Sequence, residues 1–165
     1  MKGQRVLLDT MVIIEAHRVG CWSSLQNWFK LETVERCIIE CASGNKARDG
    51  YVPLDTEKLR KEMTVHEVSQ PMRTELATKG GSMLGVHDGE RDLLSYALTQ
   101  QPIPLVCCVD KAAIRLAHKL KMLERFIALD EMAHEAGNRK QGYARQYTKA
   151  WLAEFKMAVI MGVLR

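Results

Sequence analysis

Apolar residues form two kinds of run along this chain, one typical of buried strands and the other of amphipathic helices. The runs over Arg5–Leu8 and Leu105–Val109 are apolar at nearly every position, as in strands of a parallel sheet that helices cover on both faces. An aspartate, Asp9 or Asp110, ends each run, and a helix-like segment follows. This order predicts an α/β fold, a three-layer sandwich with a mostly parallel central sheet and a Rossmann-like topology.

The segments between and after these strands are predicted to be mainly helical. The pattern indicates helices over Cys21–Leu31, over VERCIIECASGN up to Gly44–Asn45, over Pro71–Lys79, and over HDGERDLLSYALTQ with Asp88 as N-cap and Gln101–Pro102 at its end. For the stretch around Pro53 only a turn is predicted. Residues 126–136 are expected to hold a short strand and a helical turn, and a last helix is expected to begin at Ala144.

The two aspartates are the first candidates for chemistry. The carboxyl ends of parallel strands lie along one edge of a sheet, and open α/β sheets bind their ligands there. Asp9 and Asp110 are therefore expected to be neighbours, although about a hundred residues separate them.

Three further acids are candidates for the same region. Glu90 begins the apolar stripe of its helix, so its carboxylate is predicted to face inward and to need a cation, hydrogen-bond donors or a cleft. A first-turn position that complements the helix dipole is the alternative. Asp92 is turned about 200° from Glu90 and reaches a rim or solvent. Glu40 follows an apolar stretch and projects either toward the core side or into solvent.

Combining these acids gives a sharper hypothesis. Carboxylates that open toward one edge of the sheet repel one another and cannot all ionise unless a metal is present. Hard oxygen ligands of this kind select Mg²⁺ or Mn²⁺. Such ions activate water and stabilise the charge that develops on phosphorus during phosphodiester cleavage.

Four segments resemble the motifs of the PIN domain family. LLDTMVII is similar to the strand and helix start that open a PIN domain, and IIEC, with Glu40, resembles the second motif. LGVHDGERDLLSYAL resembles one version of the third motif, in which Gly-Glu, one residue and a further acid precede an apolar helix. VCCVDKAAIRLA resembles the fourth motif, a strand that leads to an aspartate and a helix. The four segments occur in the expected order over about residues 4–136.

The resemblance implies catalytic and metal-coordinating roles for Asp9, Glu40, Glu90 and Asp110, with Asp92 as an additional candidate ligand. It implies that Thr10 helps to hold the geometry at the first strand end. Two residues depart from the family pattern. Met11 stands where asparagine is common, and Cys108 stands where threonine or serine is usual, which puts the hydrogen bonding around the carboxylates in question.

On this resemblance the chain is expected to be a Mg²⁺- or Mn²⁺-dependent nuclease that hydrolyses RNA. Many small PIN proteins are toxins of bacterial toxin–antitoxin pairs, so an antitoxin protein is an expected partner. The alternative is a nuclease-inactive PIN-like module that binds RNA or a protein. A phosphatase is disfavoured because Met11 occupies the position of that class's second aspartate. A receiver domain is disfavoured because its paired acids and late lysine are missing.

Other motifs exclude further function classes. The glycine-rich GGSMLGVHDG has neither the Gly-Lys-Ser/Thr of a P-loop nor the spacing of a dinucleotide-binding turn. His87 beside Asp88 suggests His–acid catalysis, but no serine or cysteine nucleophile stands in an elbow motif. Cys37 and Cys41 have no second pair with which to bind zinc.

Composition indicates one globular domain in a reducing compartment. The chain has 165 residues, of which 47% are hydrophobic and 27% are charged, so a sizeable core is expected. The odd number of cysteines, five, predicts reduced core thiols. No apolar run reaches the roughly 18 residues needed to span a bilayer, and no signal-peptide pattern is seen at the start. We therefore expect a cytoplasmic protein without membrane contact.

The formal net charge of +4 is unevenly distributed. Residues 137–165 contain six basic residues and one acid, a net +5, which leaves about −1 for residues 1–136. The chain therefore divides into a PIN-like domain (1–136) and a basic C-terminal extension (137–165), whose charge indicates either a polyanionic partner such as RNA or a solvated helix face. An aromatic row that begins at Tyr147 is interpreted as a packing face. The apolar end, MAVIMGVL, predicts docking on the body or a homodimer.

Overall fold

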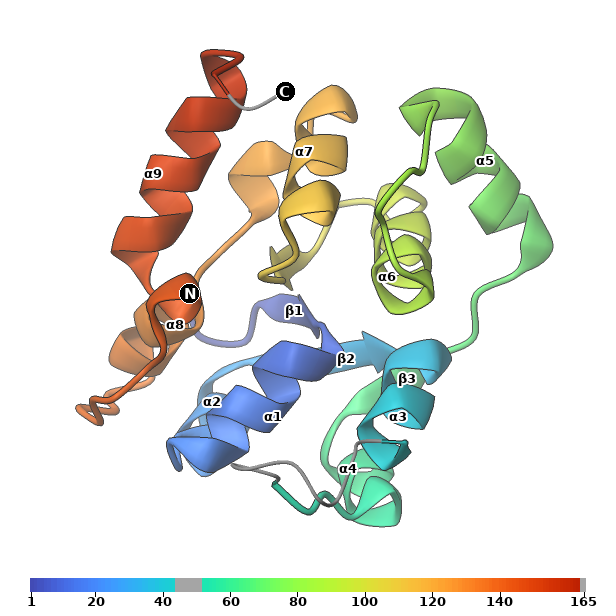
Figure 1. The fold of residues 1–165 in the computed structure, drawn as a ribbon. Coiled ribbons are helices and arrows are strands. Elements are labelled where there is room, and N and C mark those ends of the chain that lie inside the picture. Colours follow the sequence, from blue (N-terminus) through green and yellow to red (C-terminus); the bar gives the residue numbers. More distant parts are fainter. Residues whose placement is uncertain (44–51, 164–165) are drawn as a thin grey trace.

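A four-stranded parallel sheet forms the centre of the computed structural model, which describes residues 1–43 and 52–163. The strands are β1 (Arg5–Leu8), β2 (Lys30–Val34), β3 (Thr64–His66) and β4 (Leu105–Cys107), in the order β3-β2-β1-β4 (Figure 1). All three pairings are parallel, and Val6 of β1 aligns with Leu31 on one side and Leu105 on the other. Because β1 lies inside the sheet, both faces of this strand are covered.

Helices connect the strands and cover both faces of the sheet. They are α1 (Thr10–Arg18), α2 (Trp22–Trp28), α3 (Glu35–Ala42), α4 (Thr56–Glu62), α5 (Gln70–Gly80), α6 (Asp88–Leu98), α7 (Lys111–Lys119), α8 (Leu129–Glu135) and α9 (Lys149–Ile160). In Figure 1, α6 and α7 lie above the sheet and α1, α2 and α4 below it. Every helix in the described part of the chain is too short or too polar to cross a bilayer.

The alternation of side chains along β1 explains why its last three residues, Val6, Leu7 and Leu8, are all apolar. Leu7 belongs to a core built mainly from α6, α7 and α9, with Leu94, Ile114 and Phe155. Val6 and Leu8 belong to the other core, which includes residues of α1, α2 and α8. Successive residues of a strand point to opposite faces, so each core receives side chains from the same strand. This arrangement confirms the predicted three-layer α/β sandwich.

The helix predicted over Cys21–Leu31 is present as α2 but ends earlier, at Trp28, because Lys30–Val34 forms the strand β2. Glu32 interrupts the apolar pattern of this strand, yet the residue is buried. Arg5 donates two hydrogen bonds to its carboxylate, at 2.6 and 2.9 Å, and Nε2 of His66 lies 2.7 Å from Oε2. A charged residue inside a strand thus has partners from both neighbouring strands, which the local pattern does not reveal.

Other boundaries also differ from those predicted. The stretch for which only a turn was expected contains α4 and β3, and β4 ends at Cys107 rather than Val109. His87 occupies the N-cap position of α6, so Asp88 is the first helical residue. Within residues 126–136 the only strand-like pairing is a single bridge to Val106. Gly44–Asn45, the predicted end of α3, lies outside the described residues.

The C-terminal extension packs on the rest of the chain. Its helix begins at Lys149 rather than Ala144, since Thr148 caps it by accepting a hydrogen bond from the Trp151 N–H at 3.3 Å. α9 buries Leu152, Phe155 and Val159 in the core that α6 and α7 share, as expected of a packing face. Tyr147 precedes the helix and joins the other core. All five cysteines are buried and free, as predicted.

Candidate metal centre

Asp9 and Asp110 follow the adjacent strands β1 and β4, and the backbone fixes both carboxylates. Oδ1 of Asp9 accepts a hydrogen bond from the Val12 N–H at 2.7 Å, and its Oδ2 accepts one from the Val109 N–H at 3.1 Å. Oδ1 of Asp110 accepts from the Ala113 N–H at 2.7 Å. Each aspartate therefore caps the helix that follows its strand. The second hydrogen bond of Asp9 also links it to Val109, the residue next to Asp110, so the structure brings the two acids together as predicted.

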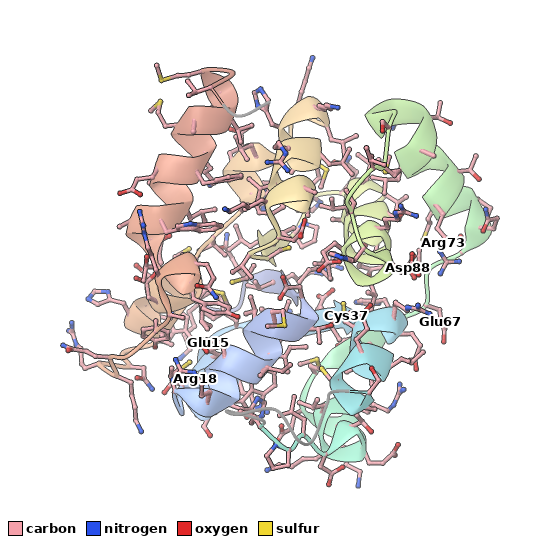
Figure 2. The ribbon with its side chains drawn as sticks, viewed as in Figure 1. Glu15, Arg18, Cys37, Glu67, Arg73 and Asp88 are labelled. Atoms are coloured by element: carbon pink, nitrogen blue, oxygen red, sulfur yellow. The ribbon has the colours of Figure 1, made fainter. Side chains whose placement is uncertain are left out.

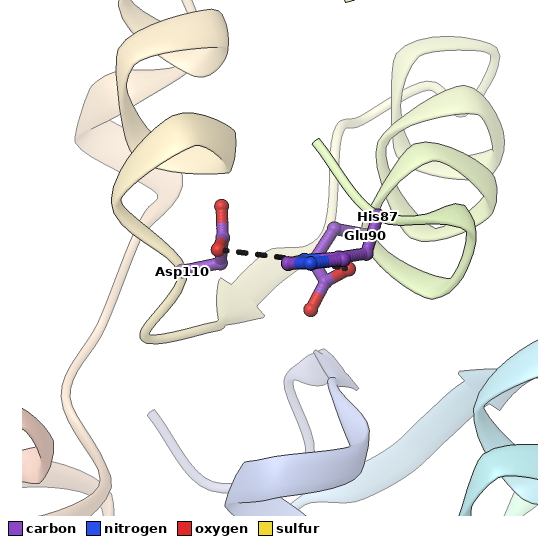
Figure 3. A group of neighbouring side chains, drawn as sticks. All are labelled: His87, Glu90 and Asp110. Atoms are coloured by element: carbon purple, nitrogen blue, oxygen red, sulfur yellow. Dashed lines mark ion pairs between the residues drawn. The ribbon is translucent and has the colours of Figure 1, made fainter. Parts of the chain in front are cut away.

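Glu90 projects from the first turn of α6 toward Asp110, as Figure 3 shows. Its side chain is 13% exposed, which confirms the predicted inward orientation. Its Oε2 is buried and has no hydrogen-bond partner among the described residues. Burial raises the pKa of Glu90, and the charges of Asp9, Asp110 and Glu40 raise it further. The carboxylates predicted from four separate segments therefore act on one another electrostatically.

His87 is a member of this cluster that sequence reasoning missed. Its Nδ1 lies 3.9 Å from Oε2 of Glu90 and 3.9 Å from Oδ2 of Asp110 (Figure 3). One potential ligand atom from each of these three residues lies within 4.8 Å of the others. The side chain is 78% exposed, so the imidazole stands at the mouth of the cluster. The available signal was its position directly before the helix that carries Glu90.

Glu40 lies beside the first turn of α6, because α3 and α6 approach closely at Gly89. A Cβ at position 89 would lie 2.6 Å from Oε2 of Glu40 and 2.9 Å from its Oε1. Thr10 donates a hydrogen bond from Oγ1 to Oε2 of Glu40 at 2.9 Å. The glycine of the Gly-Glu pair thus leaves space for the Glu40 carboxylate, and Thr10 holds that carboxylate in place.

Asp9 is the most deeply buried acid of the cluster, with 1% of its surface exposed. Burial raises its pKa, while the Cys108 thiol and the backbone N–H groups of Val12 and Val109 act in the opposite direction. Cys108 therefore interacts with Asp9 from the position where the PIN pattern has a hydroxyl. Met11, the other departure, is 44% exposed and supplies no polar group.

Asp92 does not join these carboxylates. Its two oxygens accept hydrogen bonds from Nε and Nη2 of Arg73 at 2.6 and 2.7 Å. The angle of about 200° between Asp92 and Glu90 on the helix directs the two acids to different sides of α6. The role of additional ligand suggested for Asp92 is therefore corrected: the residue joins α6 to α5.

The donor set of the cluster suits a hard divalent cation. Glu90 and Asp110 offer carboxylate oxygens, which Mg²⁺ and Mn²⁺ prefer, and His87 offers an imidazole nitrogen that Mn²⁺ also accepts. The oxygens of Asp9 and Glu40 do not belong to the group of ligand atoms that lie within 4.8 Å of one another, although the charges of both residues act on Glu90. Among the described residues, no lysine or arginine forms an ion pair with Asp9, Glu90 or Asp110. A buried carboxylate oxygen without a partner is costly, and a bound cation would remove that cost.

Comparison with known proteins leaves the family open. No protein-family model matches the chain, and no curated protein sequence matches it. The resemblance to PIN domains therefore rests on the four sequence segments.

Proposed function

We propose that the chain is a PIN-type, metal-dependent nuclease that hydrolyses RNA with Mg²⁺ or Mn²⁺. The observation that carries this proposal is the buried Oε2 of Glu90, which has no hydrogen-bond partner in the described part of the chain and experiences the charges of Asp9, Glu40 and Asp110. The position of the cluster supports it, because open α/β sheets bind ligands at the carboxyl ends of their strands.

In this proposal Asp9, Glu40, Glu90 and Asp110 hold the ion. When bound, a divalent cation lowers the pKa of a coordinated water and neutralises charge that develops at the scissile phosphate. Asp9 and Asp110 supply rigid positions, since backbone N–H groups already orient both oxygens of Asp9 and one oxygen of Asp110. His87, exposed at the mouth, can donate a hydrogen bond to a phosphate oxygen or accept a proton from an incoming water.

The basic extension gives weaker support for RNA binding than its charge indicates. Lys149 and Arg145 form ion pairs with Glu131 and Glu154, at 2.7 and 3.1 Å. Lys156 is half-buried and donates a hydrogen bond to the Phe126 carbonyl at 2.6 Å. Nη1 of Arg139 also lies 2.9 Å from Nε2 of His134, so four of the five basic side chains that the structure describes in the extension have partners within the chain. The choice of RNA as substrate rests on the PIN resemblance and the metal cluster.

An antitoxin partner and a homodimer remain part of the proposal. The end of α9 leaves apolar side chains exposed, namely Met157, Ile160, Met161 and Val163. Exposed apolar patches often mark protein interfaces, so this surface is where a second copy would bind. The toxin assignment predicts that expression of the protein arrests growth and that expression of an Asp110→Asn variant does not.

A second candidate is the nuclease-inactive module that binds RNA or a protein. Met11 favours it, because this residue leaves the first turn of α1 without the polar group of the PIN pattern. The binding module would have the same fold, and neither Mg²⁺ nor Mn²⁺ would promote cleavage of RNA by it.

Cleavage of single-stranded RNA by the purified protein with Mn²⁺ tests the proposal. Asp110→Asn keeps the oxygen that caps α7, so the variant should fold while it loses activity. Asp9→Asn should also lose activity. Asp55→Asn is the matched control, because Asp55 caps α4 away from the cluster. Absence of both metal binding and cleavage across several RNAs would reject the nuclease and favour the binding module.

A further inference from the structure

A cavity of about 390 Å³ lies between α3, α5 and α6, next to the candidate metal centre. Arg36 of α3, Arg73 of α5 and Arg91 of α6 line it together with Ser95. Figure 2 shows Arg73 and Asp88, two of its lining residues, near each other where α5 approaches α6. Arg36 connects the two sites. Its Nη2 lies 3.1 Å from Oδ2 of Asp88, and its Nε lies 3.8 Å from Oε1 of Glu40.

Two buried polar atoms in the lining have no hydrogen-bond partner among the described residues. They are Oγ of Ser95, a residue with no exposed surface, and Nε of Arg91. Buried polar groups are nearly always paired, so each such exception needs an explanation. Both groups donate hydrogen bonds, and a ligand that satisfies both must bring acceptor oxygens.

The two aspartates that line the cavity accept no hydrogen bond from Ser95 Oγ or Arg91 Nε. Arg73 binds both oxygens of Asp92, and Arg36 donates to Asp88. The three arginines and two aspartates leave a formal charge of +1. Guanidinium groups match the geometry of phosphate oxygens, so the free donors and the charge both favour an oxyanion.

The volume of the cavity and the apolar part of its lining limit further which oxyanions can bind there. Ligand cavities typically begin at about 300 Å³, so this cavity has room for more than a bare phosphate ion. Leu76, Ala77 and Met83 provide an apolar wall that can contact a sugar or a base. We propose that this cavity binds a nucleotide, with its phosphate at Ser95 and Arg91. This nucleotide is either a unit of an RNA strand or a free mononucleotide. The first of these two possibilities rests on the proposed nuclease function.

The test is calorimetric titration in EDTA, which separates binding from metal-dependent cleavage. The probes are 5′-adenylate, adenosine, inorganic phosphate and a six-nucleotide single-stranded RNA. The wild-type protein should bind adenylate at least tenfold more tightly than either adenosine or inorganic phosphate. The Ser95 hydroxyl has no hydrogen-bond partner among the described residues, so Ser95→Ala should leave the fold intact. It should weaken adenylate binding about tenfold, as loss of a hydrogen bond to a charged group does. Arg91→Gln should weaken binding at least as much.

Matched controls lie elsewhere on the surface. Ser23→Ala on α2 and Arg145→Gln beside α9 should leave adenylate binding unchanged. If Ser95→Ala weakens both the RNA and adenylate, the RNA strand is the source. If it weakens adenylate alone, a free mononucleotide is the source.

Failure of this proposal is distinguishable from failure of the proposed nuclease. If the protein binds adenylate, if Ser95→Ala weakens this binding, and if the protein cleaves no RNA with Mn²⁺, the nucleotide site is supported and the nuclease is rejected. If the protein cleaves RNA, and Ser95→Ala changes neither the affinity for adenylate nor the KM for RNA, the nuclease is supported and the nucleotide site is overturned. Adenosine that binds as tightly as adenylate would also overturn it, as would the absence of adenylate binding.

Discussion

Gly89→Ala tests whether Glu40 belongs to the metal centre without touching a carboxylate. The new Cβ would lie 2.6 Å from Oε2 of Glu40 and 3.1 Å from its Cδ, closer than these atoms can pack. The Glu40 side chain is flexible and 32% exposed. It can therefore swing away into solvent, which would remove it from the cluster and break its hydrogen bond with Thr10.

The expected cost in stability is small, because two effects oppose each other. Alanine is more favourable than glycine within a helix by up to about 1 kcal/mol. The hydrogen bond from Thr10 to the Glu40 carboxylate contributes about 1.5–3 kcal/mol where it is well shielded, and less here because Glu40 is partly exposed. The variant should therefore be destabilised by no more than about 2 kcal/mol. Its affinity for Mn²⁺ should fall at least tenfold, the size of effect seen when groups that support a metal site are lost.

Mn²⁺ titration and urea unfolding of Gly89→Ala, Glu40→Ala and the double variant provide the assay. If Gly89→Ala acts by displacing Glu40, the two changes are not additive, and the double variant binds Mn²⁺ like Glu40→Ala alone. Wild-type Mn²⁺ affinity in Gly89→Ala would refute the assignment of Glu40 to the site. Additive losses in the double variant would refute the proposed displacement.

Three further outcomes follow from the packing and the charges. In EDTA the wild type should lose stability relative to Glu90→Gln as pH rises, because an acid with a raised pKa in the folded state stabilises that state less once it must ionise. Urea unfolding should show Glu90→Gln more stable by about 1–3 kcal/mol at pH 8 and a smaller difference at pH 4; a variant less stable than wild type at pH 8 would contradict this. Asp92→Asn should cost about 1–2 kcal/mol, since it weakens the partly exposed pair with Arg73, and should leave Mn²⁺ affinity unchanged; a tenfold weaker affinity would restore Asp92 as a ligand. Phe155→Ala should cost about 3–5 kcal/mol by thermal or urea unfolding, and a cost below 1 kcal/mol would show that α9 is not docked as described.

The sequence predicts the parts of this fold that have a strong local signal. The largely apolar runs at β1 and β4 are buried, and this pattern predicts strands of a parallel sheet that helices cover on both faces, with β4 at one edge of that sheet. The strand β2 could not be recognised in the same way. Its Glu32 is compatible with burial only because Arg5 and His66 lie on the neighbouring strands. Such partners become apparent only after the chain has folded.

In the candidate site, too, some features have a local signal in the sequence and others depend on the tertiary arrangement. The order strand, aspartate, helix predicts that Asp9 and Asp110 meet at one edge of the sheet. The position of Glu90 at the start of an apolar stripe predicts its inward orientation. His87 and the close approach of Gly89 to Glu40 depend on how α6 is placed against α3 and α7. No spacing within one segment determines that placement.

Titration of Mn²⁺ into the metal-free protein, followed by electron paramagnetic resonance, tests the central claim most directly. The free Mn²⁺ signal should show saturable binding to the wild type. Glu90→Gln keeps the shape of a side chain whose Oε2 has no hydrogen-bond partner within residues 1–43 and 52–163, and it should bind Mn²⁺ at least tenfold more weakly. Glu75→Gln on the exposed side of α5 is the control and should match the wild type. Equal affinity in wild type and Glu90→Gln, or no binding by the wild type at millimolar Mn²⁺, would contradict the proposed metal centre.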